Sequence, residues 1–199
     1  MHPAAHRLPG HSQLLDHLQA VTQDVDSLAG ILNATAPLFS IMIDVVNKHH
    51  GIINKFLGDG FMAVFGAPIE ADDHADRALR AAREMLRERL PRFNRWLKEN
   101  GFRDRFRMGI GLSSGPLMSG TVGSSRRLEY AAVGDTTNTA ARLESMTKRT
   151  PHSILISEST RRLLRQPSDD LVSVGEVDVR GKRSKISVWT LAEDARRSH

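Results

Sequence analysis

The sequence predicts a mixed α+β domain in which helices and strands alternate irregularly along 199 residues. Long segments with apolar residues at three- and four-residue spacings predict helices, and short apolar runs bounded by glycine predict strands. Hydrophobic residues make up 40% of the chain, which is enough for a core and too many for a disordered chain. No internal repeat stands out, so the length fits one domain with short extensions.

The N-terminal half is expected to place a β-hairpin between helices. Pro37 marks a junction or a kink in the first helical region, and Gly51 is expected to stop it. Gly58-Asp59-Gly60 joins two short apolar runs, which is typical of a hairpin turn. Acidic residues open the second helical region, and Pro91 is a candidate kink in it. The expected elements are a disordered tail at 1–11, helix at 12–49, strands at 52–57 and 61–65, and helix at about 71–98.

The C-terminal half is expected to supply most of the sheet. Asp135 is a candidate N-cap for a helix that continues through Asn138 and Arg142. The remaining expected elements are strands at 105–112, 115–122, 130–133, 153–156, 171–179 and 186–191, a helix at 158–165, and a tail at 192–199.

Composition excludes several classes of function. The chain has no cysteine, so disulfides, thiolate metal sites and a cysteine nucleophile are ruled out. The net charge is +5, but the arginines are interleaved with glutamates on helical stretches, which favours solvated helix faces over a nucleic-acid surface. No apolar run approaches the ~20 residues of a membrane span, and the first ten residues lack the apolar core of a signal peptide. We therefore expect a soluble, cytoplasmic protein that binds no nucleic acid and has no membrane segment in this chain.

Two segments could carry chemistry, and each also has a plain structural interpretation. Asp59 lies between two glycines at the hairpin tip, where a free carboxylate suits Mg²⁺, although Gly-Asp-Gly is also ordinary turn chemistry. Lys55 lies four residues earlier and could point into the same pocket. Asn138 and Arg142 share one helix face, where an amide and a guanidinium could reach a phosphate, although a surface arginine is equally ordinary.

Taken together, several ordered segments resemble the catalytic domain of bacterial class III adenylate/guanylate cyclases. The resemblance covers about residues 12–191 and is specific as an ordered set. It rests on Lys55-Phe-Leu-Gly-Asp-Gly-Phe-Met-Ala-Val-Phe-Gly-Ala-Pro68, Met108-Gly-Ile-Gly-Leu-Ser-Ser-Gly115, Gly120-Thr-Val-Gly123, Tyr130-Ala-Ala-Val-Gly-Asp-Thr-Thr-Asn-Thr-Ala-Ala-Arg142 and Val179-Arg-Gly-Lys182.

The resemblance implies a ferredoxin-like cyclase fold, with a mixed, mostly antiparallel sheet and flanking helices, that acts as a homodimer or as a heterodimer with another cyclase domain. In this family two Mg²⁺ or Mn²⁺ ions, held by two aspartates, assist attack of the ribose 3′-hydroxyl on the α-phosphate. By the same resemblance Asp59 is a metal ligand, Asn138 orients the ribose and Arg142 stabilises the α-phosphate. Lys55 would read the purine, and Arg180 would contact the triphosphate.

The sequence departs from the family pattern at three places. The family opens with a strand that carries Phe-x-Asp, the first metal aspartate, and residues 1–10 hold neither an aspartate nor a strand-like run. The expectation is therefore a domain without its first strand. Ala131 stands where relatives carry an aspartate or threonine that reads the purine amino group, so base selectivity should be relaxed. Pro116 replaces a phosphate-binding arginine of some relatives.

The expected function is conversion of ATP to 3′,5′-cyclic AMP and diphosphate, with impaired activity as one possibility. The alternative is a catalytically degenerate cyclase-homology module that binds nucleotide or regulates a partner cyclase. Guanylate cyclase activity is a weaker alternative, because a lysine at position 55 donates to N1 of adenine, whereas guanine N1–H requires an acceptor.

Overall fold

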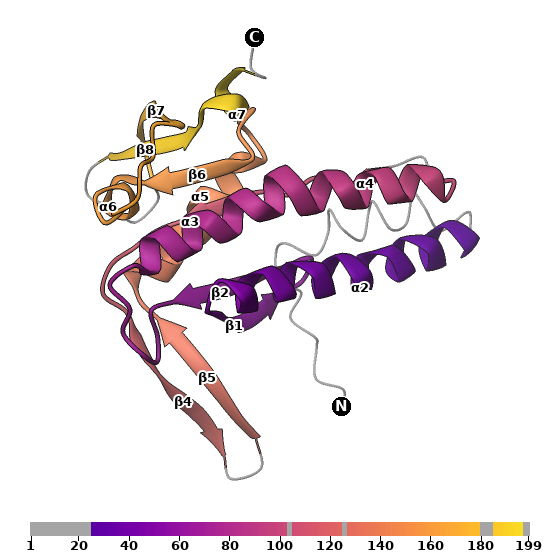
Figure 1. Ribbon diagram of the computed structural model, residues 1–199. Coiled ribbons are helices and arrows are strands. Elements are labelled where there is room, and N and C mark those ends of the chain that lie inside the picture. Colours follow the sequence, from indigo (N-terminus) through magenta and orange to yellow (C-terminus); the bar gives the residue numbers. More distant parts are fainter. Residues whose placement is uncertain (1–24, 103–104, 125–126, 180–184, 197–199) are drawn as a thin grey trace, which may run out of the picture. The chain divides into compact units, whose positions relative to one another are not determined.

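The computed structural model describes residues 25–102, 105–124, 127–179 and 185–196 (Figure 1). The chain divides into two compact units, residues 1–40 and 41–199, and each is described by itself. The predicted N-terminal tail and the expected absence of a first strand fall on residues 1–24, outside the described residues. No helix in the described ranges is long and apolar enough to cross a membrane.

Helix α2 (Val25–Lys48) continues through Pro37, so the expected junction at this proline is wrong. Met42, Val45 and Val46 are buried at helical spacing near its C-terminal end. The helix ends with His50 in the left-handed region, at φ 58°, and Gly51 already belongs to the next strand. The stop therefore comes one residue earlier than predicted, because His50 itself adopts the left-handed conformation that the sequence assigned to glycine.

The predicted hairpin is confirmed as antiparallel strands β1 (Gly51–Leu57) and β2 (Gly60–Phe65). Gly58 has φ +64°, the backbone conformation that lets a two-residue turn close. The register shifts between Ile53 and Lys55, so Asn54 is the extra residue of a β-bulge. The hairpin thus carries an irregularity four residues before its turn.

One helical region follows, built from α3 (His74–Glu84), the π-helical turn η1 (Met85–Arg89) and α4 (Leu90–Glu99). It begins three residues later than predicted. Pro91 lies in the first turn of α4, directly after η1. The proline has no N–H to donate, and the widened turn lies where the α-helical hydrogen-bond pattern is interrupted.

The main sheet has the strand order β3–β6–β8–β7: β3 (Ile110–Leu112), β6 (Ile154–Ser157), β8 (Ile186–Leu191) and β7 (Leu171–Val177). Only β3 and β6 pair in parallel, so the sheet is mixed and mostly antiparallel, as predicted. Residues 105–109 are not strand, which shortens the predicted strand to its last three residues. Helix α6 (Glu158–Arg161) is likewise shorter than predicted.

Helices cover both faces of this sheet. On one face Ile154 and Ile156 pack against Leu79 of α3. On the other face Leu155 packs against Leu143 of α5 (Asp135–Thr147). Alternate residues of β6 therefore enter opposite cores, and all three are fully buried.

Helix α5 lies directly on β3 because of two glycines. A Cβ at Gly111 would collide with the carbonyl oxygen of Ala140, and a Cβ at Gly109 would collide with the hydroxyl of Thr147. The N-cap of α5 is Gly134 rather than Asp135, which is the first helical residue. The two glycines of the Met-Gly-Ile-Gly motif are thus explained by packing, because they allow α5 to lie close to the sheet.

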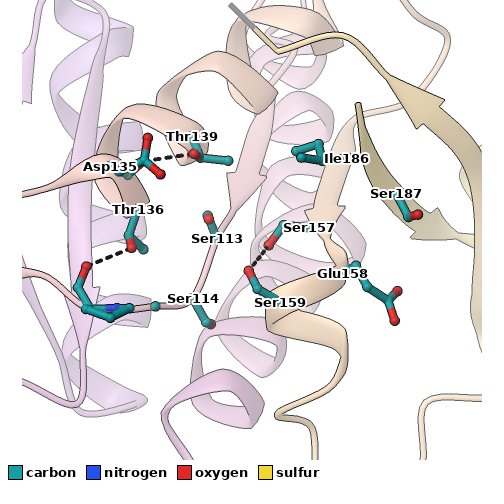
Figure 2. A pocket seen from close by; sticks show the side chains of 12 residues that line it. Ser113, Ser114, Asp135, Thr136, Thr139, Ser157, Glu158, Ser159, Ile186 and Ser187 are labelled. Carbon is teal, nitrogen blue, oxygen red and sulfur yellow. Dashed lines mark hydrogen bonds between the residues drawn. The ribbon is translucent and has the colours of Figure 1, made fainter. Parts of the chain in front are cut away.

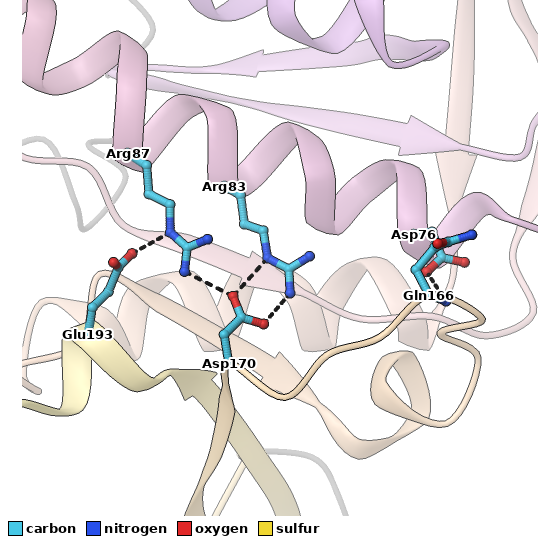
Figure 3. A network of polar contacts seen from close by, with 6 residues as sticks. All are labelled: Asp76, Arg83, Arg87, Gln166, Asp170 and Glu193. Carbon is cyan, nitrogen blue, oxygen red and sulfur yellow. Dashed lines mark hydrogen bonds and ion pairs between the residues drawn. The ribbon is translucent and has the colours of Figure 1, made fainter.

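Strands β4 (Met118–Ser124) and β5 (Arg127–Val133) form a second antiparallel hairpin, and β4 begins three residues later than predicted. A short helix, α7 (Ala192–Arg196), occupies the start of the expected C-terminal tail. Arg83 and Arg87 both bind Asp170, and Arg87 also binds Glu193 of α7 at 2.5 Å (Figure 3). This network ties α3 and η1 to the loop before β7 and to the C-terminal helix.

Candidate nucleotide site

The β1–β2 hairpin presents Asp59 and Lys55. Both side chains are exposed, Asp59 in the turn and Lys55 on β1. Among the described residues neither side chain makes a hydrogen bond or an ion pair. Within the described residues Asp59 is therefore a carboxylate available to a cation, and its role as a metal ligand stays a prediction.

Helix α5 presents Asn138 and Arg142 one turn apart. Asn138 is exposed, whereas Arg142 is half-buried, and its Nη1 atom is buried with no hydrogen-bond partner in the described part of the chain. A buried guanidinium N–H without an acceptor costs free energy, because it has lost water and gained nothing. An anionic oxygen that reached this atom would satisfy it, so Arg142 is a candidate phosphate-binding group.

The bulge residue Asn54 joins the two hairpins. Its amide nitrogen donates to the carbonyl oxygen of Ala132 at 3.5 Å, and its amide oxygen accepts from the N–H of Ala132 at 2.9 Å. Asn54 precedes Lys55, and Ala132 follows Ala131 in β5, whose register partner is Gly120. The structure therefore brings together the two strands that carry the predicted base-reading positions.

No polar contact within the described residues joins all of the predicted site residues. Arg180 lies outside the described residues, and no hydrogen bond or ion pair joins Asp59 to Asn138 or Arg142 in the described ranges. Sequence reasoning also missed Asn54. The only signal was a polar residue next to Lys55 in an otherwise apolar strand, because a bulge depends on strand pairing and leaves no clear pattern in the sequence.

A pocket of ≈ 340 Å³ lies where β3, α5, α6 and β8 meet (Figure 2). Hydroxyl groups dominate its wall, and several already have partners: Thr136 donates to Pro116, Thr139 to Asp135, and Ser157 contacts Ser159. Its lining residues are Ser113, Ser114, Gly115, Pro116, Asp135, Thr136, Thr139, Ser157, Glu158, Ser159, Ile186 and Ser187. Among the described residues, the predicted site residues Lys55, Asp59, Ala131, Asn138 and Arg142 do not line it.

The donor set fits a hard cation only in part. The described residues contain no group of three or more histidine or acidic side chains that could hold a metal ion by themselves. Asp59 supplies one carboxylate, and Mg²⁺ is commonly held by one or two carboxylates together with substrate phosphates. Asp59 therefore fits a metal that arrives with a nucleotide rather than a preformed metal cage.

The class that this fold and this arrangement indicate is a nucleotide cyclase domain. Residues 18–193 match the family model described as the adenylate and guanylate cyclase catalytic domain. The chain belongs to this family and is a class III nucleotide cyclase domain.

Sequence relatives and solved cyclase structures are also similar to this chain. The Mycobacterium tuberculosis protein Rv1319c is 34% identical over 176 residues, which cover 86% of this chain and 29% of that protein. The Mycobacterium tuberculosis protein Rv1320c is 35% identical over 152 residues, which cover 74% of this chain and 24% of that protein. The chain thus spans less than a third of the length of these relatives.

Among solved structures, the guanylyl cyclase Cya2 is 28% identical with a TM-score of 0.73, over 88% of this chain and 86% of that chain. The catalytic core of a rhodopsin-guanylyl cyclase with converted specificity, in complex with ATPαS, is 27% identical with a TM-score of 0.63, over 88% and 89%. The adenylyl cyclase CyaB from P. aeruginosa, at 24% identity and a TM-score of 0.72 over 87% of each chain, shows the same fold.

Proposed function

We propose that this domain converts ATP to 3′,5′-cyclic AMP and diphosphate. The observation that carries the proposal is the buried Nη1 of Arg142, which has no hydrogen-bond partner among the described residues and lies one helical turn after the exposed amide of Asn138. The substrate of a nucleotide cyclase domain has a ribose next to a phosphate, and these are the two groups that such a pair of side chains can bind. An amide can bind the sugar oxygen, while a guanidinium neutralises the charge that develops at the α-phosphate.

Lys55 favours adenine over guanine. Its exposed ammonium lies on β1, beside the strand that carries Ala131. An ammonium donates to the unprotonated N1 of adenine and has no acceptor to offer the N1–H of guanine. The fold alone does not choose between the substrates, since Cya2 is a guanylyl cyclase and CyaB an adenylyl cyclase.

Asp59 would hold Mg²⁺ or Mn²⁺ together with oxygens of the bound triphosphate. When bound, such an ion supplies Lewis-acid polarisation of the phosphate and lowers the pKa of a coordinated hydroxyl. Asp59 supplies only one carboxylate to the proposed site, which predicts weaker metal occupancy than two carboxylates would give.

We further propose that the site is completed across a dimer. In the described ranges no hydrogen bond or ion pair joins Asp59 to Asn138 or Arg142 of the same chain. On this proposal one triphosphate would take its metal from one protomer and its guanidinium from the other. A two-fold axis then creates two equivalent sites.

The direct test is cyclic AMP formation from Mn-ATP by the wild type, by Asp59→Ala and by Asp169→Ala. Asp169 is also an exposed aspartate that makes no hydrogen bond or ion pair with the described residues, and it lies outside the proposed site, which makes it a matched control. We expect Asp59→Ala to lose on the order of 10²-fold or more in rate, and Asp169→Ala to behave like the wild type. Equal background rates in all three proteins would refute cyclase activity of this chain. Mn-ATP binding without turnover would support a nucleotide-binding module that regulates a partner cyclase.

A further inference from the structure

Asn54 occupies a position that ordinary strand pairing does not explain. It is the extra residue of the bulge in β1, with no register partner in β2. Its half-buried side chain instead makes both hydrogen bonds to the backbone of Ala132 and contacts the sulfur of Met62 at 3.6 Å. By donating an N–H to the carbonyl oxygen of Ala132 and accepting from its N–H, the side-chain amide imitates one residue of a β-ladder, and its nitrogen also donates to Met62.

This contact matters because the two hairpins belong to separate sheets. Strands β1 and β2 form one two-stranded sheet, and β4 and β5 form another. The amide of Asn54 fixes the position of β1 against β5 at the residues that adjoin Lys55 and Ala131. Bulges commonly redirect side chains next to functional sites, and here the bulge turns Asn54 towards the neighbouring hairpin.

We infer that Asn54 is a positioning residue that determines base selectivity by holding the Lys55 strand against the Ala131 strand. The inference deepens the proposed cyclase function and rests on it. Alanine has no polar side-chain atom to read the exocyclic group of a purine, so discrimination at this site depends on where the Lys55 ammonium lies. Without the amide, β1 is free to shift relative to β5, and Lys55 loses its fixed distance to purine N1.

The chain provides a matched control for this contact. Asn94 of α4 makes the same pair of hydrogen bonds to one backbone residue, donating to the carbonyl oxygen of Phe106 at 2.9 Å and accepting from its N–H at 2.8 Å. Asn94 is half-buried like Asn54 and lies on neither hairpin. Asn94→Leu therefore removes equivalent hydrogen bonds without touching the strands of the site.

The experiment measures kcat and KM for Mn-ATP and Mn-GTP in the wild type, Asn54→Leu, Asn54→Gln and Asn94→Leu, with equilibrium binding of both nucleotides in parallel. We expect Asn54→Leu to lower the ATP-to-GTP ratio of kcat/KM by about tenfold, the factor that one net hydrogen bond contributes. Asn54→Gln keeps both hydrogen-bonding groups on a side chain that is one methylene longer. Its ATP-to-GTP ratio of kcat/KM should therefore lie between the ratios of Asn54→Leu and the wild type. Asn94→Leu should lower thermal stability to a similar extent and leave the ratio unchanged.

The outcomes separate this inference from the proposed function. If the wild type makes cyclic nucleotide and Asn54→Leu has the same ratio as Asn94→Leu, Asn54 has a purely structural role and the inference is wrong. If the wild type turns over neither nucleotide, the proposed function fails, and the ATP-to-GTP ratio of binding constants then decides the role of Asn54. A wild type that neither binds nor converts nucleotide overturns both.

Discussion

Glu84 is a buried carboxylate surrounded by three basic side chains. Its side chain is 7% exposed, and its oxygens lie 2.8 Å from Lys48 Nζ, 2.9 Å from His49 Nε2 and 2.6 Å from Arg89 Nη2. The hydrogen bond from Lys48 lowers the pKa of Glu84 most. Burial opposes this shift, and further hydrogen bonds from Arg89 and His49 help bring the pKa to about 2. The cluster joins the end of α2 to η1, directly before the β1–β2 hairpin.

This shift predicts a loss of stability in acid. Because the pKa of Glu84 is lower in the folded chain than its ordinary value of 4.5, the stabilisation is complete above about pH 5 and is lost as the pH falls towards 2. We expect the free energy of unfolding to fall by on the order of 2 kcal/mol over this range. In urea titrations Glu84→Gln should be less stable than the wild type at pH 7, and the difference should shrink towards pH 2. A constant difference at all pH values would contradict this assignment.

The pKa of Asp170 is also set by burial and by hydrogen bonds from basic side chains, although Asp170 is more exposed than Glu84. Burial raises the pKa of its carboxyl, but the hydrogen bonds from Arg83 and Arg87 outweigh burial and hold the pKa below the usual range. The resulting contacts connect α3 and η1 to the loop before β7, and Asp76 accepts hydrogen bonds from the backbone of Arg165 and Gln166 in the same region (Figure 3). These acidic residues have structural partners, which distinguishes them from the free carboxylate of Asp59.

The contact between α5 and β3 is the packing element on which the position of Asn138 and Arg142 depends. At Gly111 the backbone of α5 leaves no room for a methyl group. Because backbone atoms of a packed helix cannot rotate away, any side chain at this position forces the helix to move.

We therefore expect Gly111→Ala to displace α5 from the sheet. Overpacking of this kind costs about 1–3 kcal/mol, and a small shift of Asn138 and Arg142 should lower kcat by about 10²-fold. Thermal unfolding and steady-state kinetics measure the two effects. Gly120→Ala is the control, since a Cβ at Gly120 meets no atom within 4 Å. Equal stability and activity in the two variants would show that α5 tolerates the change.

The local sequence predicted several elements well and missed others for identifiable reasons. The β1–β2 hairpin and β8 follow from apolar runs and turn residues, and both are confirmed. Residues 105–109 alternate like a strand but form none, because pairing needs a neighbouring strand that the local pattern does not specify. Pro37 is exposed inside a continuous helix of 24 residues, so the one helical hydrogen bond that proline cannot donate did not end the helix here.

At the scale of the dimer, the proposed site combines Asp59 of one protomer with Arg142 of the other. A complementation experiment with two inactive variants tests this arrangement. Asp59→Ala and Arg142→Ala should each be inactive as homodimers. After the two proteins are mixed and allowed to exchange, half of the dimers are mixed, and each mixed dimer has one intact site of two. We expect about a quarter of the wild-type activity in a two-fold symmetric dimer.

A tagged protomer verifies that the subunits have exchanged. If the mixture then stays inactive, Asp59 and Arg142 belong to one site within a single chain. Mixing Asp59→Ala with Asp59→Ala that carries the other tag is the matched control, and it should recover nothing.

Local motifs and their spacing were enough to identify the family, the order of most elements and the candidate residues Lys55, Asp59, Asn138 and Arg142. The contact of β1 with β5 through Asn54, and the buried nitrogen of Arg142 that has no partner in the described ranges, became visible only in the folded chain. Strand pairing, bulges and burial arise between segments distant in the chain, so no local pattern encodes them directly.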